Sequence, residues 1–585
     1  MGAHRALATA LAALAVMGAA KPDDRRINYR LTPEFDQSGL IDLKVSLSLR
    51  ADASGRTRLD LPDESMGEHE RWRMLSRFEA AGARIEEDGP AHRVLISRPN
   101  APVTLTYHVR SAYAADPQGS DGNPYKGPIV RPAWFATQGD FVFVTPEGRD
   151  HDPATFRWGA SPQAALPQAA LPKGWTVASN LDGAGRHLTV EEISESTLIG
   201  GTDVRLYARP ILGGVMRFAV RGDWRFAEGR FADEVASVVS AQRKFWGGLR
   251  TPYFVSLTPL ASGNHLSVGG MGRFQGFALF ATANAPDAIL RRTLAHEHTH
   301  NWIPGMQGRM AEGTQEPSVY WYSEGFTDFY TDRTLLRSGQ WSPQDFVAHL
   351  NTVLREYDAS PLREAPNSVI VSDFWKSPTA RGLPYQRGYL LAFLWDAEMR
   401  RATRSAQSLD DVMFAMRDRY VAAPAGAKPM VVESFEATAE RLTGVDVRPD
   451  IETFVTRGAP IYLPPDLFAG CASVGSQTAP SYDLGFDAEA SAARGVFTKV
   501  DPAGPAYRAG LRDGMKRIAR EGGAPGDSRT AITYRVKDQS GAEQVIRYKP
   551  EGQSTVSFQE VAWEGGAATP PAACSAVLGG ALPRR

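Results

Sequence analysis

The sequence has 585 residues, more than one hydrophobic core usually organises, and a prior of about 150 residues per domain predicts several units. Lys and Arg total 65 against 66 Asp and Glu, which gives a net charge of −1, and no long run of one sign occurs. This balance argues against a nucleic-acid-binding surface or a polybasic membrane patch. Hydrophobic residues make up 43% of the chain, which excludes a mostly disordered or collagen-like protein.

The first twenty residues have the pattern of a secretory signal peptide. A positively charged start at 1–5 precedes an apolar stretch at 6–17 and the small residues Gly18-Ala19-Ala20. An uncleaved hydrophobic anchor is the alternative. No later segment approaches the roughly 18 uninterrupted apolar residues that a spanning helix needs. We therefore expect a periplasmic or secreted protein whose mature chain has no membrane span and binds no nucleic acid.

Hydrophobic periodicity predicts two domains of different class. Residues 41–50 and 103–109 alternate between apolar and polar side chains, as half-buried strands do, so we expect an N-terminal antiparallel β domain at 21–206. Helical spacing then predominates, after short strands at 253–257 and 265–268. The second domain, residues 207–465, is thus predicted to be α+β and mostly helical towards its end. Its expected helices are 231–245, 287–302, 323–336, 342–357, 385–401 and two starting at 408 and 431.

A histidine cluster lies inside the helix expected at 287–302. His296 and His300 are four residues apart, so both imidazoles leave one helix face and can share one ion, with Glu297 beside them facing a bound water. This His-Glu-x-x-His spacing is typical of metallopeptidases, in which the Glu is the general base. A surface histidine cluster is the alternative. His298 points to another face and is not expected to be a ligand.

A catalytic zinc ion takes three protein ligands and keeps one position open. The helix that includes 321–328 offers Glu324 as the third ligand, and Asp328 one turn further could accept a hydrogen bond from the other ring nitrogen of a ligand histidine. Alternatively, Glu324 is a solvated acid near a helix start, where the helix dipole favours it.

The pattern resembles the glycyl aminopeptidase family of zinc metallopeptidases. The resemblance rests on His296-Glu297 with His300-x-Trp302, on Trp321-x-x-Glu324-Gly325-Phe326, and on the segment 385–394. That family is related to the aminopeptidase N group, and the resemblance implies a β domain, a thermolysin-like catalytic domain and a PDZ domain in this order. It also implies one Zn²⁺ ion held by His296, His300 and Glu324, with Glu297 acting on the water and Tyr385 donating a hydrogen bond to the oxyanion.

One segment departs from the family pattern. Relatives have Gly-Gly-Leu-Glu-His ahead of the zinc helix, and its Glu is expected to hold the amine of the substrate; here the segment reads Gly269-Gly270-Met271-Gly272-Arg273. These residues could still pair with a substrate backbone along a strand edge. Arg273 is expected to repel an ammonium group and to accept a carboxylate or a blocked terminus. Glu312 and Glu316 are the candidate substitute anchors.

The third unit, 466–564, resembles a PDZ domain, and a Gly/Ala/Pro-rich tail follows at 565–585. Leu484, Gly485 and Phe486 match the carboxylate-binding loop and first strand, and 500–514 matches a later strand, turn and helix. A PDZ domain receives an extended C-terminal peptide by strand addition; the alternative is a spacer that binds no peptide. Cys471 and Cys574, the two cysteines, flank this unit and could form a disulfide in an oxidising compartment.

The sequence thus predicts an exported zinc-dependent peptidase that acts on peptides or proteins, aminopeptidase-like but without the usual amine-anchoring Glu. The rival hypothesis is a PDZ-based peptide-binding protein with an inactive or repurposed protease fold. The intact His-Glu-x-x-His motif and Glu324 argue against the rival, because a decaying site usually loses its ligands first.

Overall fold

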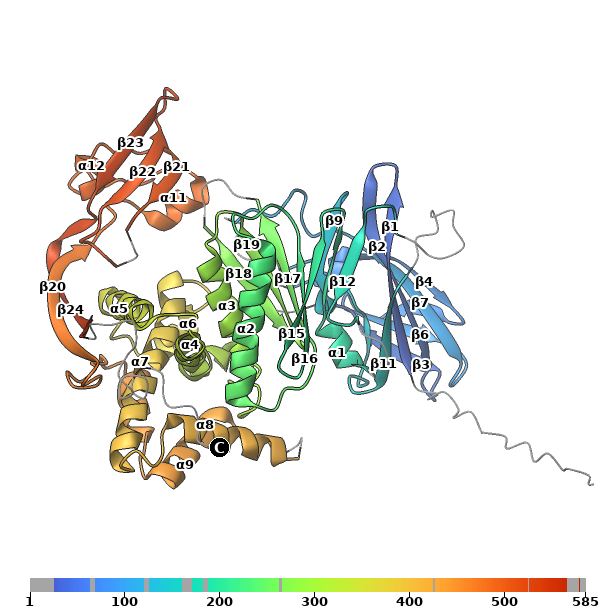
Figure 1. The fold of residues 1–585 in the computed structure, drawn as a ribbon. Helices are drawn as coiled ribbons and strands as arrows, with labels where there is room; N and C mark the ends of the chain where they lie inside the picture. The colour runs from blue at the N-terminus through green and yellow to red at the C-terminus, as the bar shows by residue number, and fades with distance from the viewer. Residues whose placement is uncertain are drawn as a thin grey trace, which may run out of the picture.

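The computed structural model describes residues 26–564 and Leu578, except 64–68, 120–125, 160–170, 183–187, 262–265, 425–426 and 524–525. The predicted signal peptide at 1–20 therefore lies outside the described residues, as does the tail at 565–585 apart from Leu578. Figure 1 shows a β-rich N-terminal domain, a central domain that becomes helical, and a small C-terminal unit. Within the described ranges, every helix is too short or too polar to cross a membrane.

The N-terminal domain consists of strands whose alternate residues are buried. In β2 (Gly39–Arg50), Leu43, Val45 and Leu47 are fully buried, whereas the intervening Lys44 and Ser46 are partly exposed. Most strand pairs are antiparallel, as predicted, but β1 (Ile27–Asp36) pairs in parallel with β11 (Pro153–Trp158). The largest sheet has the order β13 (Leu188–Thr189), β11, β1, β2, β7 (Pro102–Val109), β4 (Leu75–Ala81).

Two four-stranded sheets and a short helix complete this domain. One sheet has the order β10 (Thr145–Pro146), β3 (Arg56–Asp60), β6 (His92–Ile96), β5 (Arg84–Glu87). The other has the order β12 (Thr176–Ser179), β14 (Thr197–Gly201), β9 (Trp134–Gln138), β8 (Ile129–Arg131). Helix α1 (Val190–Ser194) begins with a capping box formed by Thr189 and Glu192.

The central domain begins with a five-stranded mixed sheet. Its order is β15 (Arg205–Ile211), β16 (Gly214–Val220), β17 (Tyr253–Leu260), β19 (Gly276–Thr282), β18 (Val268–Arg273). Strand β18 is antiparallel to β19 and forms the edge of the sheet. Its observed start at Val268 places all four residues of 269–272 within the strand, further along than the short strand predicted at 265–268. The apolar sides of α2 (Glu228–Trp246) and α3 (Asp287–Thr299) pack on this sheet.

The helices of the central domain follow the predicted order, with shifted ends. Helix α3 ends three residues before the predicted boundary, since Pro304 and Gly305 disfavour further helix. Helix α7 begins well before the predicted residue 385, because Ser377 caps it and Pro378 occupies its first turn, where the missing N–H costs nothing. The set is α4 (Tyr320–Arg337), α5 (Pro343–Ala359), α6 (Asn367–Asp373), α7 (Pro378–Ala402), α8 (Leu409–Ala422), α9 (Val431–Thr443) and α10 (Arg448–Asp450).

Helices α4 and α7 cross at two glycines. A Cβ added to Gly388 would lie 1.6 Å from the carbonyl oxygen of Trp321, and one added to Gly325 would lie 2.4 Å from the Cα of Gly388. The two backbones are therefore in direct contact, which only glycine permits. Because Glu324 and Tyr385 lie next to this crossing, it determines how they face one another.

The C-terminal unit is joined to the central domain by a long two-stranded ribbon of β20 (Ala472–Tyr482) and β24 (Glu551–Trp563). The ribbon is fastened to α5, since Asn351 exchanges two hydrogen bonds with the backbone of Val561, at 2.7 and 2.8 Å. Cys471 is buried and disulfide-bonded; Cys574, the other cysteine, lies outside the described residues. The unit also contains α11 (Ala488–Arg494), α12 (Pro505–Arg508) and a sheet of β21 (Lys516–Glu521), β22 (Ile532–Lys537) and β23 (Glu543–Tyr548).

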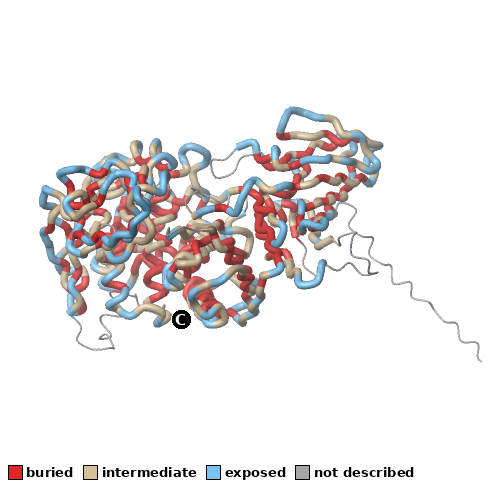
Figure 2. Tube along the Cα trace, turned by 90° about the horizontal axis from the view of Figure 1, so that it is seen from above, coloured by how far each residue is buried: buried red, intermediate tan, exposed pale blue. Residues whose placement is uncertain are grey.

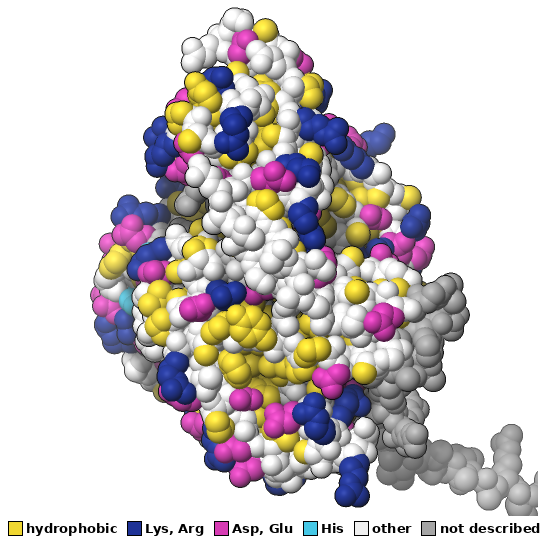
Figure 3. Space-filling view, turned by 90° about the vertical axis from the view of Figure 1, so that its left-hand side faces the viewer, with side chains coloured by type: hydrophobic (Ala, Val, Ile, Leu, Met, Phe, Trp, Pro, Cys, Tyr) yellow, Lys and Arg dark blue, Asp and Glu magenta, His cyan; other side chains and the backbone are white. Residues whose placement is uncertain are grey.

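Burial and surface charge agree with the composition. Figure 2 shows buried residues inside the β domain and the helical region, with exposed residues along the outer turns. On the face shown in Figure 3, acidic and basic side chains are interspersed and neither sign dominates, as the net charge of −1 predicts.

Candidate active site

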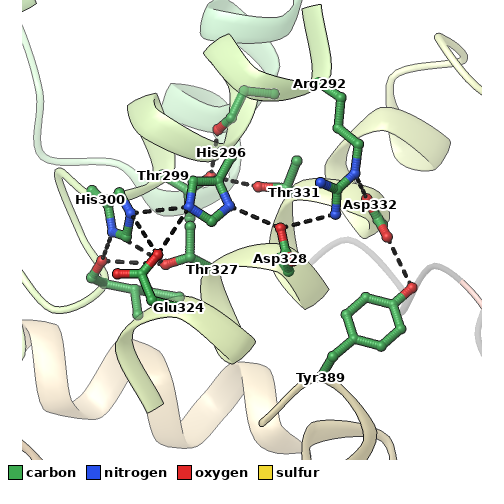
Figure 4. A network of polar contacts seen from close by, with 12 residues as sticks. Arg292, His296, Thr299, His300, Glu324, Thr327, Asp328, Thr331, Asp332 and Tyr389 are labelled. Atoms are coloured by element: carbon green, nitrogen blue, oxygen red, sulfur yellow. Dashed lines mark hydrogen bonds and ion pairs between the residues drawn. The ribbon is translucent and has the colours of Figure 1, made fainter. Parts of the chain in front are cut away.

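The structure brings the three predicted metal ligands together. The Nε2 atom of His296 lies 3.1 Å from Nε2 of His300 and 3.2 Å from Oε2 of Glu324, and the third side of this triangle is 3.5 Å. Helix α3 provides both histidines, because His300 keeps helical dihedral angles (φ −59°, ψ −18°) just beyond the helix end. Helix α4 packs beside α3 and supplies Glu324 (Figure 4).

The chemistry of these donor atoms fits a zinc ion. The Nδ1 atom of His300 donates to the carbonyl oxygen of Ile303 at 2.8 Å, so the proton lies on Nδ1 and the lone pair on Nε2 faces the triangle. His296 donates from Nδ1 to Asp328 in the same way. Ligands about 2.0–2.1 Å from a tetrahedral ion lie about 3.3 Å from one another, close to the observed spacing.

A buried polar network orients His296. One oxygen of Asp328 accepts from Nδ1 of His296 at 2.8 Å and from Arg292 at 2.9 Å (Figure 4). The same guanidinium donates to Asp332 at 2.9 Å, and Asp332 also accepts from the hydroxyl of Tyr389. Burial opposes ionisation of Asp328, but the charge of Arg292 outweighs it and holds its pKa well below the usual value. Asp328 thus remains a carboxylate and fixes the ring orientation and tautomer of His296.

Glu297 lies beside the ligand triangle. Burial raises the pKa of its carboxyl above the ordinary value, while His296 and His300 pull it down. A Cβ added to Gly272 would lie 3.9 Å from Oε2 of Glu297, so the edge strand β18 passes next to this carboxylate. A carboxylate with a raised pKa beside a metal site is suited to accepting and returning a proton.

His298 takes no part in the triangle. Its Nδ1 atom contacts Oε1 of Gln242 on α2 at 2.7 Å, and burial lowers the pKa of the imidazole well below its usual value. The histidine is thus a neutral residue of the core, on the opposite side of α3.

Tyr385 faces the ligands from α7. Its ring stacks on that of His296 with centroids 6.0 Å apart, and the side chain lines a cavity of about 570 Å³ together with the ligands. Burial and the nearby Glu324 raise the pKa of the phenol well above its usual value. The hydroxyl therefore keeps its proton and can donate a hydrogen bond.

The glycine-rich strand lines the same cavity, and its glycines differ in their surroundings. A Cβ at Gly270 would lie 2.3 Å from the carbonyl oxygen of Ala278, so packing against β19 requires glycine there. Gly272 has open space on the side facing Glu297. Gly269 and Met271 complete the lining strand.

Arg273 was expected to bind a substrate carboxylate, but in the structure it is already paired with two acidic side chains. Its guanidinium donates to Asp140 at 2.9 Å and lies 3.5 Å from Glu195, and the side chain is only 10% exposed. The N-terminal domain has thus already neutralised this charge, although the residue contributes to the cavity wall. Of the two substitute anchors, Glu312 is exposed, and Glu316 is hydrogen-bonded to Tyr320.

Sequence reasoning missed several residues of the cavity wall. Arg292 precedes His296 by one helical turn, a spacing that could have suggested it. Arg381 precedes Tyr385 by one turn. A predicted helix that began at residue 378 would have placed Arg381 on the same face as Tyr385. The aromatic residues Tyr320, Phe374 and Trp375 carry no local signal, because they reach the cavity only through the packing of α4, α6 and α7.

In the C-terminal unit, Leu484, Gly485 and Phe486 lie in the loop between β20 and α11, outside any strand. Gly485 has φ +74°, which favours glycine, and its N–H donates to the carboxylate of Asp483 at 2.7 Å. Leu484 and Phe486 pack against the small core of the unit.

Comparison with known proteins identifies the fold. Residues 290–376, which include His296, His300 and Glu324, match the family of M61 glycyl aminopeptidases. The chain has the fold of an aminopeptidase N family protein from Idiomarina loihiensis, with a TM-score of 0.66 and 16% sequence identity over 94% of this chain and 100% of that chain. An M1 zinc metallopeptidase from Deinococcus radiodurans is also similar, with a TM-score of 0.43 and 15% identity over 75% and 95% of the two chains. No curated protein matches the sequence.

Proposed function

We propose that this protein is an exported zinc-dependent peptidase. The observation that carries the proposal is the convergence of two imidazole lone pairs and the Glu324 carboxylate, at distances of 3.1 to 3.5 Å, in a cavity that Glu297 also lines. Three protein ligands with space on one side are typical of a catalytic zinc site, whereas structural sites have four. When bound, zinc supplies Lewis-acid activation of water and of a carbonyl group.

The side chains around the ligands have separate roles in the proposed hydrolysis. Glu297 accepts a proton from the attacking water and returns it to the amine that leaves when the peptide bond breaks. Tyr385 donates a hydrogen bond to the oxygen on which negative charge develops. The edge strand at Gly269–Gly272 pairs with the substrate backbone and holds the scissile bond beside Glu297. Asp328 and Arg292 keep His296 in position.

The match to the glycyl aminopeptidases supports an aminopeptidase-like activity, but no acidic residue of β18 is available to hold a substrate amine. The N-terminal pattern at 1–20 supports export to the periplasm or beyond. We also propose that the C-terminal unit is a PDZ-type domain; the internal hydrogen bond of Gly485 counts against a preformed carboxylate loop and favours its alternative role as a spacer.

The test is hydrolysis of one peptide pool, presented with free and with acetylated N-termini, by the zinc-loaded protein. We expect a chelator to abolish cleavage and added zinc to restore it. In the Glu297→Gln variant, the cleavage rate should fall by about 10²-fold or more although the variant keeps its zinc. Unchanged activity in this variant would refute the proposed role of Glu297. A zinc-loaded protein that cleaves neither pool would support the rival hypothesis of a peptide-binding protein.

A further inference from the structure

Some charged side chains that line the cavity already form ion pairs within the protein, and others do not. Arg292 is paired with Asp328 and Asp332, and Arg273 is paired with Asp140 and Glu195. The acids Glu324, Glu297 and Asp328 are engaged in or beside the ligand triangle. Arg381 is exposed, lines the cavity, and has no side-chain hydrogen bond or ion pair with any residue that the structure describes.

The position of Arg381 places it close to the reacting groups. It lies four residues before Tyr385 on α7, so both side chains leave the same face about 6 Å apart along the helix. Tyr385 in turn stacks on His296. The Arg381 side chain therefore lines the same cavity as Tyr385 and the three predicted ligands.

The remaining wall near Arg381 is aromatic. Phe374 and Trp375 lie between α6 and α7, and Trp375 is 51% exposed. Aromatic rings at the mouth of the cavity can contact the apolar part of a bound peptide while the guanidinium binds its charged group. The cavity thus offers an unpaired cation beside aromatic side chains, and its described acidic lining residues are Glu324, Glu297 and Asp328, which lie in or beside the ligand triangle.

We propose that Arg381 binds a carboxylate of the substrate, so that the preferred substrates are short peptides with a carboxylate near the scissile bond. This inference rests on the proposed peptidase function. A guanidinium suits the role because its planar donors match both oxygens of a carboxylate. The carboxylate belongs either to the C-terminus of a di- or tripeptide or to an acidic side chain.

The experiment compares kcat/KM for one tripeptide as the free acid and as the C-terminal amide. A second pair, both amidated, carries Glu or Gln at the last position and tests the side chain as the source. A hydrogen bond to a charged group contributes about 1.5–3 kcal/mol, so we expect at least one carboxylate form to be preferred by about 10- to 100-fold. The pair that shows the preference identifies the source.

Variants on one helix show whether Arg381 causes the preference. In Arg381→Gln the ratio between the carboxylate and neutral forms should fall to about 1, and Arg381→Lys should keep an intermediate ratio. Arg401→Gln, at an exposed position near the other end of α7, is the matched control and should keep the full ratio. Equal cleavage of acid and neutral peptides by the unaltered protein, or a full ratio in Arg381→Gln, would overturn this inference alone. Failure to cleave any of the four peptides would overturn the proposed function as well.

Discussion

Replacing Gly388 with alanine should separate two helices that the active site needs in contact. The added Cβ would lie 1.6 Å from the carbonyl oxygen of Trp321, whereas real Cβ atoms keep at least 3.0 Å from other atoms. The helices must move apart by about 1.4 Å, because the obstructing atom belongs to the backbone and cannot rotate away. Overpacking costs about 1–3 kcal/mol when side chains can adjust, so we expect about 3 kcal/mol or more here.

Thermal unfolding followed by circular dichroism measures this cost. For a domain of this size, about 3 kcal/mol corresponds to a fall of roughly 6–12 °C in Tm. Zinc retention and peptide hydrolysis should fall too, since Glu324 and Tyr385 lie on the two separated helices. The control is Gly382→Ala on the same helix, where the nearest atom, Nε2 of Gln386, is 3.9 Å away. Alanine should stabilise that position by about 0.5–1 kcal/mol.

The outcome that would refute the reasoning is specific. If the Gly388→Ala variant melts within about 2 °C of the unaltered protein and keeps its zinc, the close approach of α4 and α7 does not limit stability. If both glycine variants are destabilised equally, the effect comes from the helix itself and not from the crossing.

Two further predictions concern buried carboxylates. Asp328→Asn should weaken zinc binding by about 10- to 100-fold, because the amide accepts a weaker hydrogen bond from His296. Competition with a metal indicator measures the zinc affinity, and an unchanged affinity would contradict the role of Asp328 in orienting His296. Burial opposes ionisation of Asp396, but the charge of Arg333 outweighs this effect and lowers the pKa of the carboxyl in the folded state. The carboxylate therefore stabilises the folded state at pH values above the unfolded-state pKa of about 4, and this stabilisation is lost as the pH falls towards the folded-state pKa. Asp396→Ala should therefore cost about 3–5 kcal/mol at pH 7 and less at pH 3.5 in denaturant unfolding; an equal cost at both would refute this.

Local spacing predicted that His296 and His300 lie side by side. The i, i+4 relation of His296 and His300 depends only on helical geometry over one turn, and it persists although α3 ends before His300. Alternation of apolar residues along β2 likewise depends on nothing beyond the strand itself. Such features are visible in sequence because the physical cause acts between near neighbours.

The limits of helix α7 show where local signals fail. Gly382 and Pro384 ordinarily disfavour a helix, and the sequence analysis predicted this helix only from residue 385. In the structure Ser377 and Pro378 begin the helix, and packing against α4 maintains it through both residues. The early start brings Arg381 onto the cavity wall.

The sequence by itself predicted the pairing of His296 and His300 on one helix face, Glu297 as the general base, the change from β to helical structure and a glycine-rich strand without an acidic residue. Only the tertiary structure decided which charges remain available to a substrate. Arg273 is neutralised by Asp140 and Glu195, 133 and 78 residues away, whereas Arg381 remains unpaired among the described residues. Pairing between charges depends on distance in space, and distant segments meet only when the domains pack together.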